Sequence, residues 1–416
     1  MTLQSPRISP RSGDSQDSPL DIERRACAVC GSRSKRRLFR QRFAAISGAT
    51  LLRGYDVVAC EGCGFCYADN LPRQEAFDTY YRSMSKYEHQ DRAGKPSEFE
   101  TRQFPALASA IAEHVPSLHS RILEVGCANG GLLGALRELG YLDVLGVEPS
   151  PASLENAWRL YRIRVMTGTL TRLPADLGTF DFVILIAVLE HIRDLESAME
   201  RIRGLVSPSG RVFVEVPDVA GFAASPEPPF QEFSIEHINF FSSISLANLM
   251  GAYGFAELQS SQIAYRQSDT QAGTALRSAF QLRADARASH PIHDRLSEPS
   301  LTDYIAASRT VEAAISQVVG RLVASQQPVV VWGAGTQTQR LLAAGGLARA
   351  NIVAFVDSNP HYQGKRLIGL PILAPGEMKS RGEAILVSSQ AAQSEIVHQI
   401  RVDLGLANEV ITLSEA

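Results

Sequence analysis

The sequence has no apolar run long enough to cross a membrane. The longest run, FVILIAVL at residues 182–189, has the length of a buried strand, whereas a membrane helix needs about 20 apolar residues. The first residues, MTLQSPRISPRSGDSQDSPLD, contain no apolar segment of the kind that a secretory signal needs. Ser, Pro and Asp dominate there, which predicts a disordered tail over residues 1–22. We therefore expect a cytoplasmic protein with no membrane partner.

An excess of charge of one sign is also lacking. The 41 Lys and Arg residues nearly balance 44 Asp and Glu residues, so the formal charge of −3 gives no reason to expect a nucleic-acid partner. One basic run, RSKRRLFRQR at residues 33–42, has only Phe39 as an interleaved aromatic residue, which favours a solvated hairpin face. The length of 416 residues predicts two or three domains. Nothing in the composition sets the oligomeric state.

Cysteine is scarce, with six residues in the chain, but four of them form two matched C-x-x-C-G pairs, CAVCG and CEGCG. Two such pairs supply a tetrahedral thiolate set for zinc, and all four positions would be filled by protein, so the site would be structural. Unrelated buried thiols or two disulfides are the alternatives, which the spacing and a cytosolic setting disfavour. We expect a zinc ribbon-like module over residues 23–95. Its predicted ligands are Cys27, Cys30, Cys60 and Cys63.

The next region alternates strands with helices. RILEVGCANGGLLGALRELG at residues 121–140 predicts a buried strand, a Gly turn and a helix. The turn has the form Glu124-x-Gly126-x-x-x-Gly130, which differs from the G-x-G-x-x-G of nicotinamide sites. Glu148 ends the following strand, where a carboxylate can accept hydrogen bonds from both hydroxyls of a ribose. Two further strands complete a predicted doubly wound parallel sheet over residues 96–262, with its ligand at the carboxyl ends of the strands.

These motifs resemble those of class I methyltransferases that use S-adenosyl-L-methionine (SAM). The order is E-x-G-x-x-x-G, an acidic strand end, D-F-x-x-x-x-x-V-L-E-H-I and S-P-S-G before a strand. The alternative is a Rossmann-like domain that has lost its ligand. Thr169 stands where an acidic residue usually lies near the adenine, so no adenine contact is predicted, and Glu190-His191 is interpreted as structural or cofactor-shaping. The resemblance implies SAM as the cofactor, bound by Glu124, Gly126, Gly130, Glu148 and Ala187.

The last third of the chain predicts a connector and another domain. TVEAAISQVVGRLVA has one apolar helical face, so we expect a connector with a long helix over residues 263–325. PVVVWGAGTQTQRLL then predicts a strand, a turn at Gly333 and Gly335, and a helix, and further strands follow. Together they predict a Rossmann-like domain over residues 326–416. The N–H groups of the Gly turn could hold a phosphate, or the glycines could only close the turn.

The three parts together resemble the three-domain sugar C-methyltransferases of deoxysugar pathways. The expected fold class is therefore α/β, a class I SAM methyltransferase with a zinc ribbon-like module and a C-terminal Rossmann-like domain. The resemblance implies a small-molecule substrate, a nucleotide-diphosphate sugar with a keto group, bound between the SAM domain and the C-terminal domain.

The same resemblance places the catalytic segment in QEFSIEHINFFS, residues 231–242. The family pattern Y-x-E-H is matched here except that Ser234 replaces the tyrosine. His237 is the predicted base that forms a sugar enolate, and Glu236 is predicted to orient it or stabilise the imidazolium. A core histidine bonded to the backbone is the alternative. An O- or N-methyltransferase and a non-catalytic binding scaffold also remain open. Tyr80, Tyr81 and Tyr87 either close over SAM or pack the zinc module.

Overall fold

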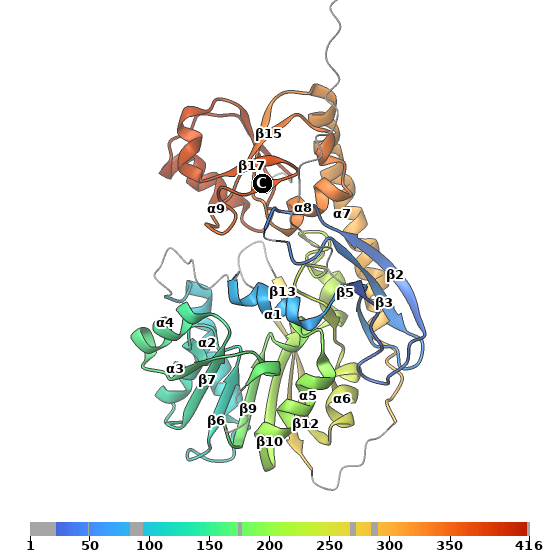
Figure 1. Ribbon diagram of the computed structural model, residues 1–416, viewed down its shortest axis with the longest axis vertical. Coiled ribbons are helices and arrows are strands. Elements are labelled where there is room, and N and C mark those ends of the chain that lie inside the picture. The colour runs from blue at the N-terminus through green and yellow to red at the C-terminus, as the bar shows by residue number, and fades with distance from the viewer. Residues whose placement is uncertain are drawn as a thin grey trace, which may run out of the picture.

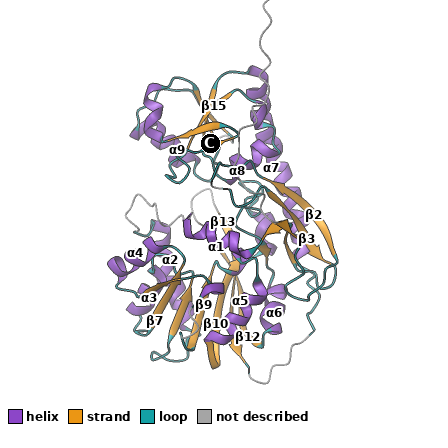
Figure 2. Cartoon of the chain, viewed as in Figure 1, coloured by secondary structure: helices purple, strands orange, loops and turns teal. Residues whose placement is uncertain are grey.

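The computed structural model describes residues 22–48, 50–83, 95–173, 177–266, 272–283 and 290–413. The predicted tail, except residue 22, and Tyr87 lie outside these residues. Figure 1 shows an α/β domain below and a smaller domain above, with the N-terminal strands and the long helix α7 along one side. Figure 2 shows that helices flank the strands of the lower domain on both sides.

The N-terminal module is an antiparallel sheet that borrows a strand from the middle of the chain. Strands β2 (Lys35–Arg42), β3 (Gly54–Cys60) and β4 (Cys66–Asp69) pair in sequence order. The fourth strand, β11 (Asn239–Phe240), pairs with β4. Beside this sheet, β1 (Ile22–Glu23) pairs with β5 (Leu71–Pro72). Because β11 directly follows Glu236 and His237, the module helps to fix the position of that segment.

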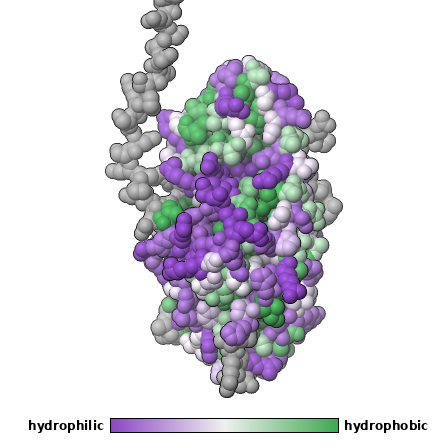
Figure 3. Space-filling model, turned by 90° about the vertical axis from the view of Figure 1, so that its right-hand side faces the viewer, coloured by the Kyte–Doolittle hydropathy of each residue, from purple (hydrophilic) through white to green (hydrophobic). Residues whose placement is uncertain are grey.

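The basic run forms β2, and its arginines are exposed. Arg40 pairs with Asp56 through Nε at 2.7 Å, and Arg36 pairs with Glu298 of helix α7. Figure 3 views this side of the molecule and shows hydrophilic residues gathered across the middle of the face. The solvated hairpin face that the sequence predicts is therefore present.

The middle domain is built on a seven-stranded sheet in the order β12-β13-β10-β9-β6-β7-β8. Five strands are parallel, and their side chains alternate between two cores. Ile122 and Ile184 pack with helices α2 and α3, whereas Leu123 and Leu185 pack with α5 and α6. The elements are β6 (Ile122–Val125), β7 (Val144–Glu148), β8 (Val165–Thr167), β9 (Phe180–Ile186), β10 (Val206–Pro217), α2 (Glu98–Ala112), α3 (Gly131–Glu138), α4 (Pro151–Tyr161), α5 (Leu195–Leu205) and α6 (Ser243–Ala252).

The far edge of this sheet differs from the prediction. Strands β12 (Phe255–Arg266) and β13 (Ala272–Leu282) are antiparallel, and β13 pairs with β10. The sheet is therefore mixed rather than wholly parallel, and the predicted connector from residue 263 begins inside it. The apolar residues Ala275, Leu276, Ala279 and Phe280 are buried in this sheet, although Arg277 and Gln281 make the segment look polar.

The C-terminal domain has a six-stranded sheet in the order β16-β17-β15-β14-β18-β19. All neighbouring pairs are parallel except β16 with β17, and the order is that of a Rossmann-like half. Its elements are β14 (Val329–Trp332), α8 (Thr336–Ala343), β15 (Ile352–Val356), β16 (Arg366–Leu367), β17 (Leu370–Leu373), β18 (Ala384–Val387), α9 (Gln393–His398) and β19 (Val410–Thr412).

Helix α7 (Ser297–Ser325) joins the domains and is longer than the predicted helix. Its first half buries Leu301 and Tyr304 among the aromatic residues around the catalytic segment. Its second half buries Ile315 and Val319 in the core of the C-terminal domain. One rigid helix of 29 residues therefore contributes to two cores and connects them.

Candidate active site and metal centre

The four paired cysteines converge at one point. The sulfurs of Cys27 and Cys63 lie 3.5 Å apart, as do those of Cys30 and Cys60, and all four lie within 4.8 Å of one another. Each pair closes the same turn: the N–H of Gly31 donates to the Cys27 carbonyl and that of Gly64 to the Cys60 carbonyl, both at 2.8 Å. Tetrahedral zinc with bonds of about 2.3 Å separates its sulfurs by roughly 3.8 Å. The thiol set therefore fits zinc.

The Gly turn between β6 and α3 leaves space beside the backbone. Gly126 and Gly130 have positive φ values of 76° and 77°. A Cβ atom on Gly126 would lie 2.9 Å from Val188 Cγ2, so a side chain there is disfavoured by both conformation and space. Gly130 packs its backbone against Ala157, where a Cβ atom would lie at 3.1 Å. Gly126 lines two neighbouring cavities of about 130 Å³ and 190 Å³, whereas Gly130 supports the turn from behind.

Two buried carboxylates face this turn. Glu148 accepts hydrogen bonds from the N–H groups of Ala128 at 3.0 Å and Ser150 at 3.2 Å, and it lines the larger cavity. Glu124 lines the smaller cavity, and its Oε2 atom has no hydrogen-bond partner. Burial and the charge of Glu148 raise the pKa of Glu124 to about 8. A ligand with a cationic amine would give this carboxylate a partner. Three features together fit SAM: the carboxylate of Glu124 with an oxygen that lacks a hydrogen-bond donor, the acid Glu148 at a strand end, and the open Gly turn.

Ala187 lies in both cavities at the end of β9, with a φ of 53°. The larger cavity continues past it to Tyr81, His191 and Glu236. Gly126, Glu148 and Ala187 therefore line one cavity together with Glu236 of the predicted catalytic segment. Glu124 lines the smaller neighbouring cavity, and Gly130 lines neither. His237 itself is not among the residues that line the larger cavity, but it makes an edge-to-face contact with His191, with 5.1 Å between ring centroids and 64° between ring planes.

The predicted catalytic segment is held in place by the N-terminal module. Gln41 Nε2 donates to the Phe233 carbonyl at 2.7 Å, and the Tyr55 hydroxyl donates to the Ser234 carbonyl at 2.8 Å. Ser234 Oγ accepts from the backbone N–H groups of Glu236 at 3.2 Å and His237 at 3.0 Å, forming a tight turn. The flanking apolar residues are buried, which explains why an acid and an imidazole occur in so apolar a stretch. These residues are Phe233, Ile235, Ile238, Phe240 and Phe241.

The acid beside His237 is not the predicted one. Glu232 Oε2 lies 3.5 Å from His237 Nδ1, whereas Glu236 Oε1 accepts a hydrogen bond from the Tyr80 hydroxyl at 3.1 Å. Adjacent residues on this turn point to different partners, and Glu232 rather than Glu236 is placed to contact the imidazole directly. Burial lowers the pKa of His237. Glu232 and the neighbouring carboxylates of Glu190 and Glu236 raise it by more than burial lowers it, so the net shift is upward.

His191 lines the cavity beside the Gly turn, and its sequence motif was interpreted as structural or cofactor-shaping. Its Nδ1 atom lies 3.0 Å from the Glu236 carbonyl oxygen and 3.1 Å from the Tyr81 hydroxyl. The neighbouring Glu190 is buried, neither of its carboxylate oxygens has a hydrogen-bond partner, and burial raises its pKa to about 7. The sequence signal that could have pointed to both histidines is the repeated Glu-His pair, at 190–191 and 236–237.

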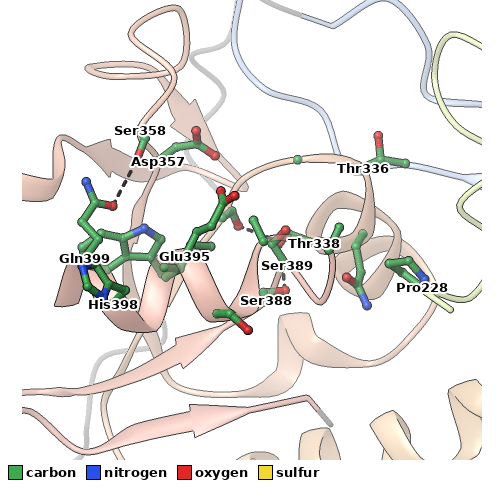
Figure 4. A pocket seen from close by; sticks show the side chains of 18 of the residues that line it. Pro228, Thr336, Thr338, Asp357, Ser358, Ser388, Ser389, Glu395, His398 and Gln399 are labelled. Atoms are coloured by element: carbon green, nitrogen blue, oxygen red, sulfur yellow. Dashed lines mark hydrogen bonds between the residues drawn. The ribbon is translucent and has the colours of Figure 1, made fainter. Parts of the chain in front are cut away.

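A third and larger cavity of about 830 Å³ lies on the C-terminal domain. It is lined by the Gly turn at Gly333 and Gly335, by Asp357 at the end of β15, by the serines that follow β18, and by polar residues of α9 (Figure 4). Asp357 accepts from the N–H groups of Ala334 at 2.7 Å and Asn359 at 2.8 Å, and burial raises its pKa. Pro228 and Gln231, from the segment that leads into the catalytic turn, line its other side.

The pKa of Tyr362 is affected by acids from two cavities. Burial raises its pKa most, and the carboxylates of Asp357 and Glu236 raise it further. Asp357 lines the C-terminal cavity and Glu236 lines the cavity beside the Gly turn of the middle domain.

Comparisons with known proteins agree with the fold of the middle domain. Residues 92–260 match a family model described as a methyltransferase domain, and residues 325–412 match one described as C2185-like, N-terminal. With its sheet order and Gly turn, the middle of the chain is a class I SAM-dependent methyltransferase domain.

Individual relatives are similar over part of the chain. C-methyltransferase NovU of Streptomyces niveus is 29% identical over 196 residues, which are 44% of this chain and 45% of NovU. A ubiquinone biosynthesis O-methyltransferase of Azotobacter vinelandii is 32% identical over 116 residues, 26% of this chain and 49% of that enzyme. The chain thus spans about half the length of these relatives. Magnesium protoporphyrin IX methyltransferase of Synechocystis PCC 6803, solved with bound SAH, aligns with 50% of this chain and 100% of that chain at 15% identity and a TM-score of 0.39.

Among the described residues, none of the helices combines the length and the apolar character that a membrane span requires. Helix α7 is long enough for a membrane span, but its residues are too polar on average to lie in lipid.

Proposed function

We propose that the protein transfers a methyl group from SAM to a carbon beside the ketone of a nucleotide-diphosphate-linked keto-deoxysugar. The observation that best supports this proposal is that a single segment, residues 228–236, lines two cavities. Pro228 and Gln231 line the C-terminal cavity, and Glu236 lines the cavity beside the Gly turn. A substrate with a nucleotide at one end and a reacting sugar at the other needs two such spaces. Similarity to a protein named as a C-methyltransferase supports the same choice.

The residues around SAM would have distinct tasks. Glu124 would accept from the amine of its methionine part, Glu148 from its ribose hydroxyls, and the turn at Gly126 would allow close approach of the backbone. Bound there, SAM supplies an electrophilic methyl group on its sulfonium. Ala187 would lie beside the same group, at the end of β9.

Methylation of carbon requires loss of a proton from the carbon that is methylated. We assign this proton to the neutral imidazole of His237. Glu232, at 3.5 Å from Nδ1, would stabilise the imidazolium that results. His191 and Tyr81 lie on the cavity side of His237, where they would hold the ketone oxygen or pass the proton on. The buried aromatic residues around the segment exclude water, which strengthens these charge interactions.

The C-terminal cavity would bind the nucleotide diphosphate. Helix α8 begins at Thr336 directly after Gly335, and its N-terminal N–H groups suit a phosphate. The zinc module would act at a distance from the chemistry: zinc would hold β3 and β4 in place, and β4 pairs with the strand that follows His237.

O- or N-methylation of a sugar is the second candidate function. It is favoured by Ser234, which stands where the sugar C-methyltransferases carry a tyrosine, and by similarity to enzymes named as O-methyltransferases. The same base would deprotonate a hydroxyl or amine, and no enolate would be needed. A non-catalytic scaffold that binds SAM and a nucleotide sugar is the third candidate.

Incubation with SAM and a panel of nucleotide-linked keto sugars separates these candidates. Carbon methylation gives S-adenosylhomocysteine (SAH) and a product with a C–CH₃ signal in its NMR spectrum that resists cleavage of methyl ethers. A methoxy or N-methyl signal supports the second candidate instead. Release of no SAH with any sugar, from protein that binds SAH, would support the scaffold.

A further inference from the structure

Helix α1 (Gln74–Ser83) contributes one face to the cavity of the methyltransferase domain, although it precedes that domain in the chain. Gln74, Asp78 and Tyr81 all line the cavity, and their spacing of four and three residues places them on one side of a helix. In Figure 1, α1 lies across the carboxyl-terminal edge of the domain's strands. Gln74 Oε1 holds the helix there, because it accepts from the N–H groups of Arg193 and Asp194, both at 2.9 Å.

The carboxylate of Asp78 is fixed at one end of this cavity. Oδ1 accepts from Gln74 Nε2 at 3.0 Å, and Oδ2 lies 3.1 Å from Arg172 Nε. Arg172 ends the short helical turn that follows Thr169, and Thr169 lines the cavity as well. Asp78 is only 4% exposed. A carboxylate has about four lone-pair sites, so these two partners leave it able to accept from a ligand.

The two neighbouring cavities beside the Gly turn together have two distinct ends, one at Glu124 and one at helix α1. Glu124, Ala128 and Asn129 line the smaller space at one end, which suits an amino acid moiety. Glu148 lies between that end and Gly168, whose N–H donates to the Glu148 carbonyl at 3.1 Å. A ribose held at Glu148 therefore directs its base toward the residues 168–170, where α1 closes the cavity. The acceptor that α1 brings to this end is Asp78.

Adenine presents an exocyclic amino group there, which is a donor and needs an acceptor when water is excluded. Thr169 carries a hydroxyl rather than a carboxylate, and its Oγ1 is 3.2 Å from Thr171 Oγ1. We propose that Asp78, from the segment outside the methyltransferase domain, accepts the 6-amino group of the SAM adenine and so selects adenine over other purines. This rests on the proposed use of SAM.

The test is the affinity of the full chain for SAH and for S-inosylhomocysteine, in which a 6-oxo group replaces the amino group, measured by calorimetry. The oxo group is an acceptor and would face a carboxylate, so we expect wild-type protein to bind SAH more tightly by about tenfold or more. In Asp78→Asn the amide can donate to the oxo group, and the preference should fall to about twofold or reverse. Adding Thr169→Asp to that variant should return part of the preference for SAH.

Two controls separate recognition from structure. Arg172→Ala removes the ion pair but keeps the carboxylate, so it should weaken both ligands alike and keep the preference. Equal affinity of wild-type protein for both ligands would overturn the inference even if Asp78→Asn does not fold, and so would an unchanged preference in a folded Asp78→Asn. Wild-type protein that binds neither ligand would overturn the proposed function as well.

Discussion

The imidazole rings of His191 and His237 lie 5.1 Å apart between centroids and are tilted by 64°, one on the cavity beside the Gly turn and the other against Glu232. The two residues come from different loops, 46 positions apart. Their contact joins the loop after β9 to the catalytic turn. Any proton that His237 takes up therefore lies beside a second imidazole, and the two histidines must be distinguished by experiment.

We predict that His237→Ala lowers the rate of methyl transfer by about 10² to 10⁴-fold, the usual contribution of a general base. The affinity for SAH should stay within about twofold, because His237 lies behind His191 rather than on the cofactor cavity. Single-turnover rates and calorimetry measure the two quantities. His119→Ala, on an exposed loop, is the matched control. Full activity in His237→Ala, with activity lost in His191→Ala, would transfer the role of base to His191.

The pH dependence of kcat/KM should report the charge of Glu232. The base must be neutral, and the pKa of His237 is raised, so activity should rise with pH through a midpoint above the ordinary histidine value of about 6.5. Glu232→Gln removes the contact that opposes burial. Burial, the largest single influence on this pKa, is then opposed less, so the midpoint should move to lower pH. Maximal activity should fall, because the imidazolium loses its partner. Glu200→Gln, exposed on α5, should leave the profile unchanged. A midpoint that stays in place in Glu232→Gln would contradict this assignment.

Zinc should be retained at about one equivalent per chain, and Cys63→Ser should lose it. Structural zinc contributes on the order of 10 kcal/mol to small modules, so the sheet of β2, β3 and β4 should unfold without it. Methyl transfer should then be lost, because that sheet holds β11 and the catalytic turn. Elemental analysis, circular dichroism and activity provide the readouts. Cys66→Ser is the control, since Cys66 is buried near the site but its sulfur lies against the Gly64 carbonyl. Retention of metal by Cys63→Ser would exclude the four-cysteine site.

Local patterns in the sequence were sufficient for the elements and for the parts of the site that lie on single turns. The Gly turn at Gly126, the acid that ends β7 and the two cysteine knuckles each depend on residues close together in the chain. Alternation and helical spacing are local physical signals, so the strands and helices around them were predicted in the right order.

The remaining features depend on contacts between distant segments. β11 joins a sheet more than 150 residues earlier in the chain, and no local pattern encodes that pairing. Glu232 rather than Glu236 meets His237 because the turn at Ser234 folds the chain back on itself. Asp78 lines the cofactor cavity only because Gln74 fixes α1 to the start of α5. The strand β13 was missed because charged and polar residues interrupt its apolar alternation.

The C-terminal cavity offers a test of nucleotide binding that leaves the backbone unstrained. Gly335 has a φ of −72°, and a Cβ atom built on it would meet nothing within 4 Å, so Gly335→Val should fold and fill part of the cavity. We expect it to weaken binding of a nucleoside diphosphate by at least about tenfold, since bulk beside the α8 N-terminus blocks the approach of a phosphate to its N–H groups. SAH affinity should be unchanged, because SAH is assigned to the other cavity. Gly376→Val, exposed in the same domain with equal free space, should bind like wild type. Unaltered nucleotide affinity in Gly335→Val, measured by calorimetry, would place the nucleotide elsewhere and remove the main reason for a nucleotide-linked substrate.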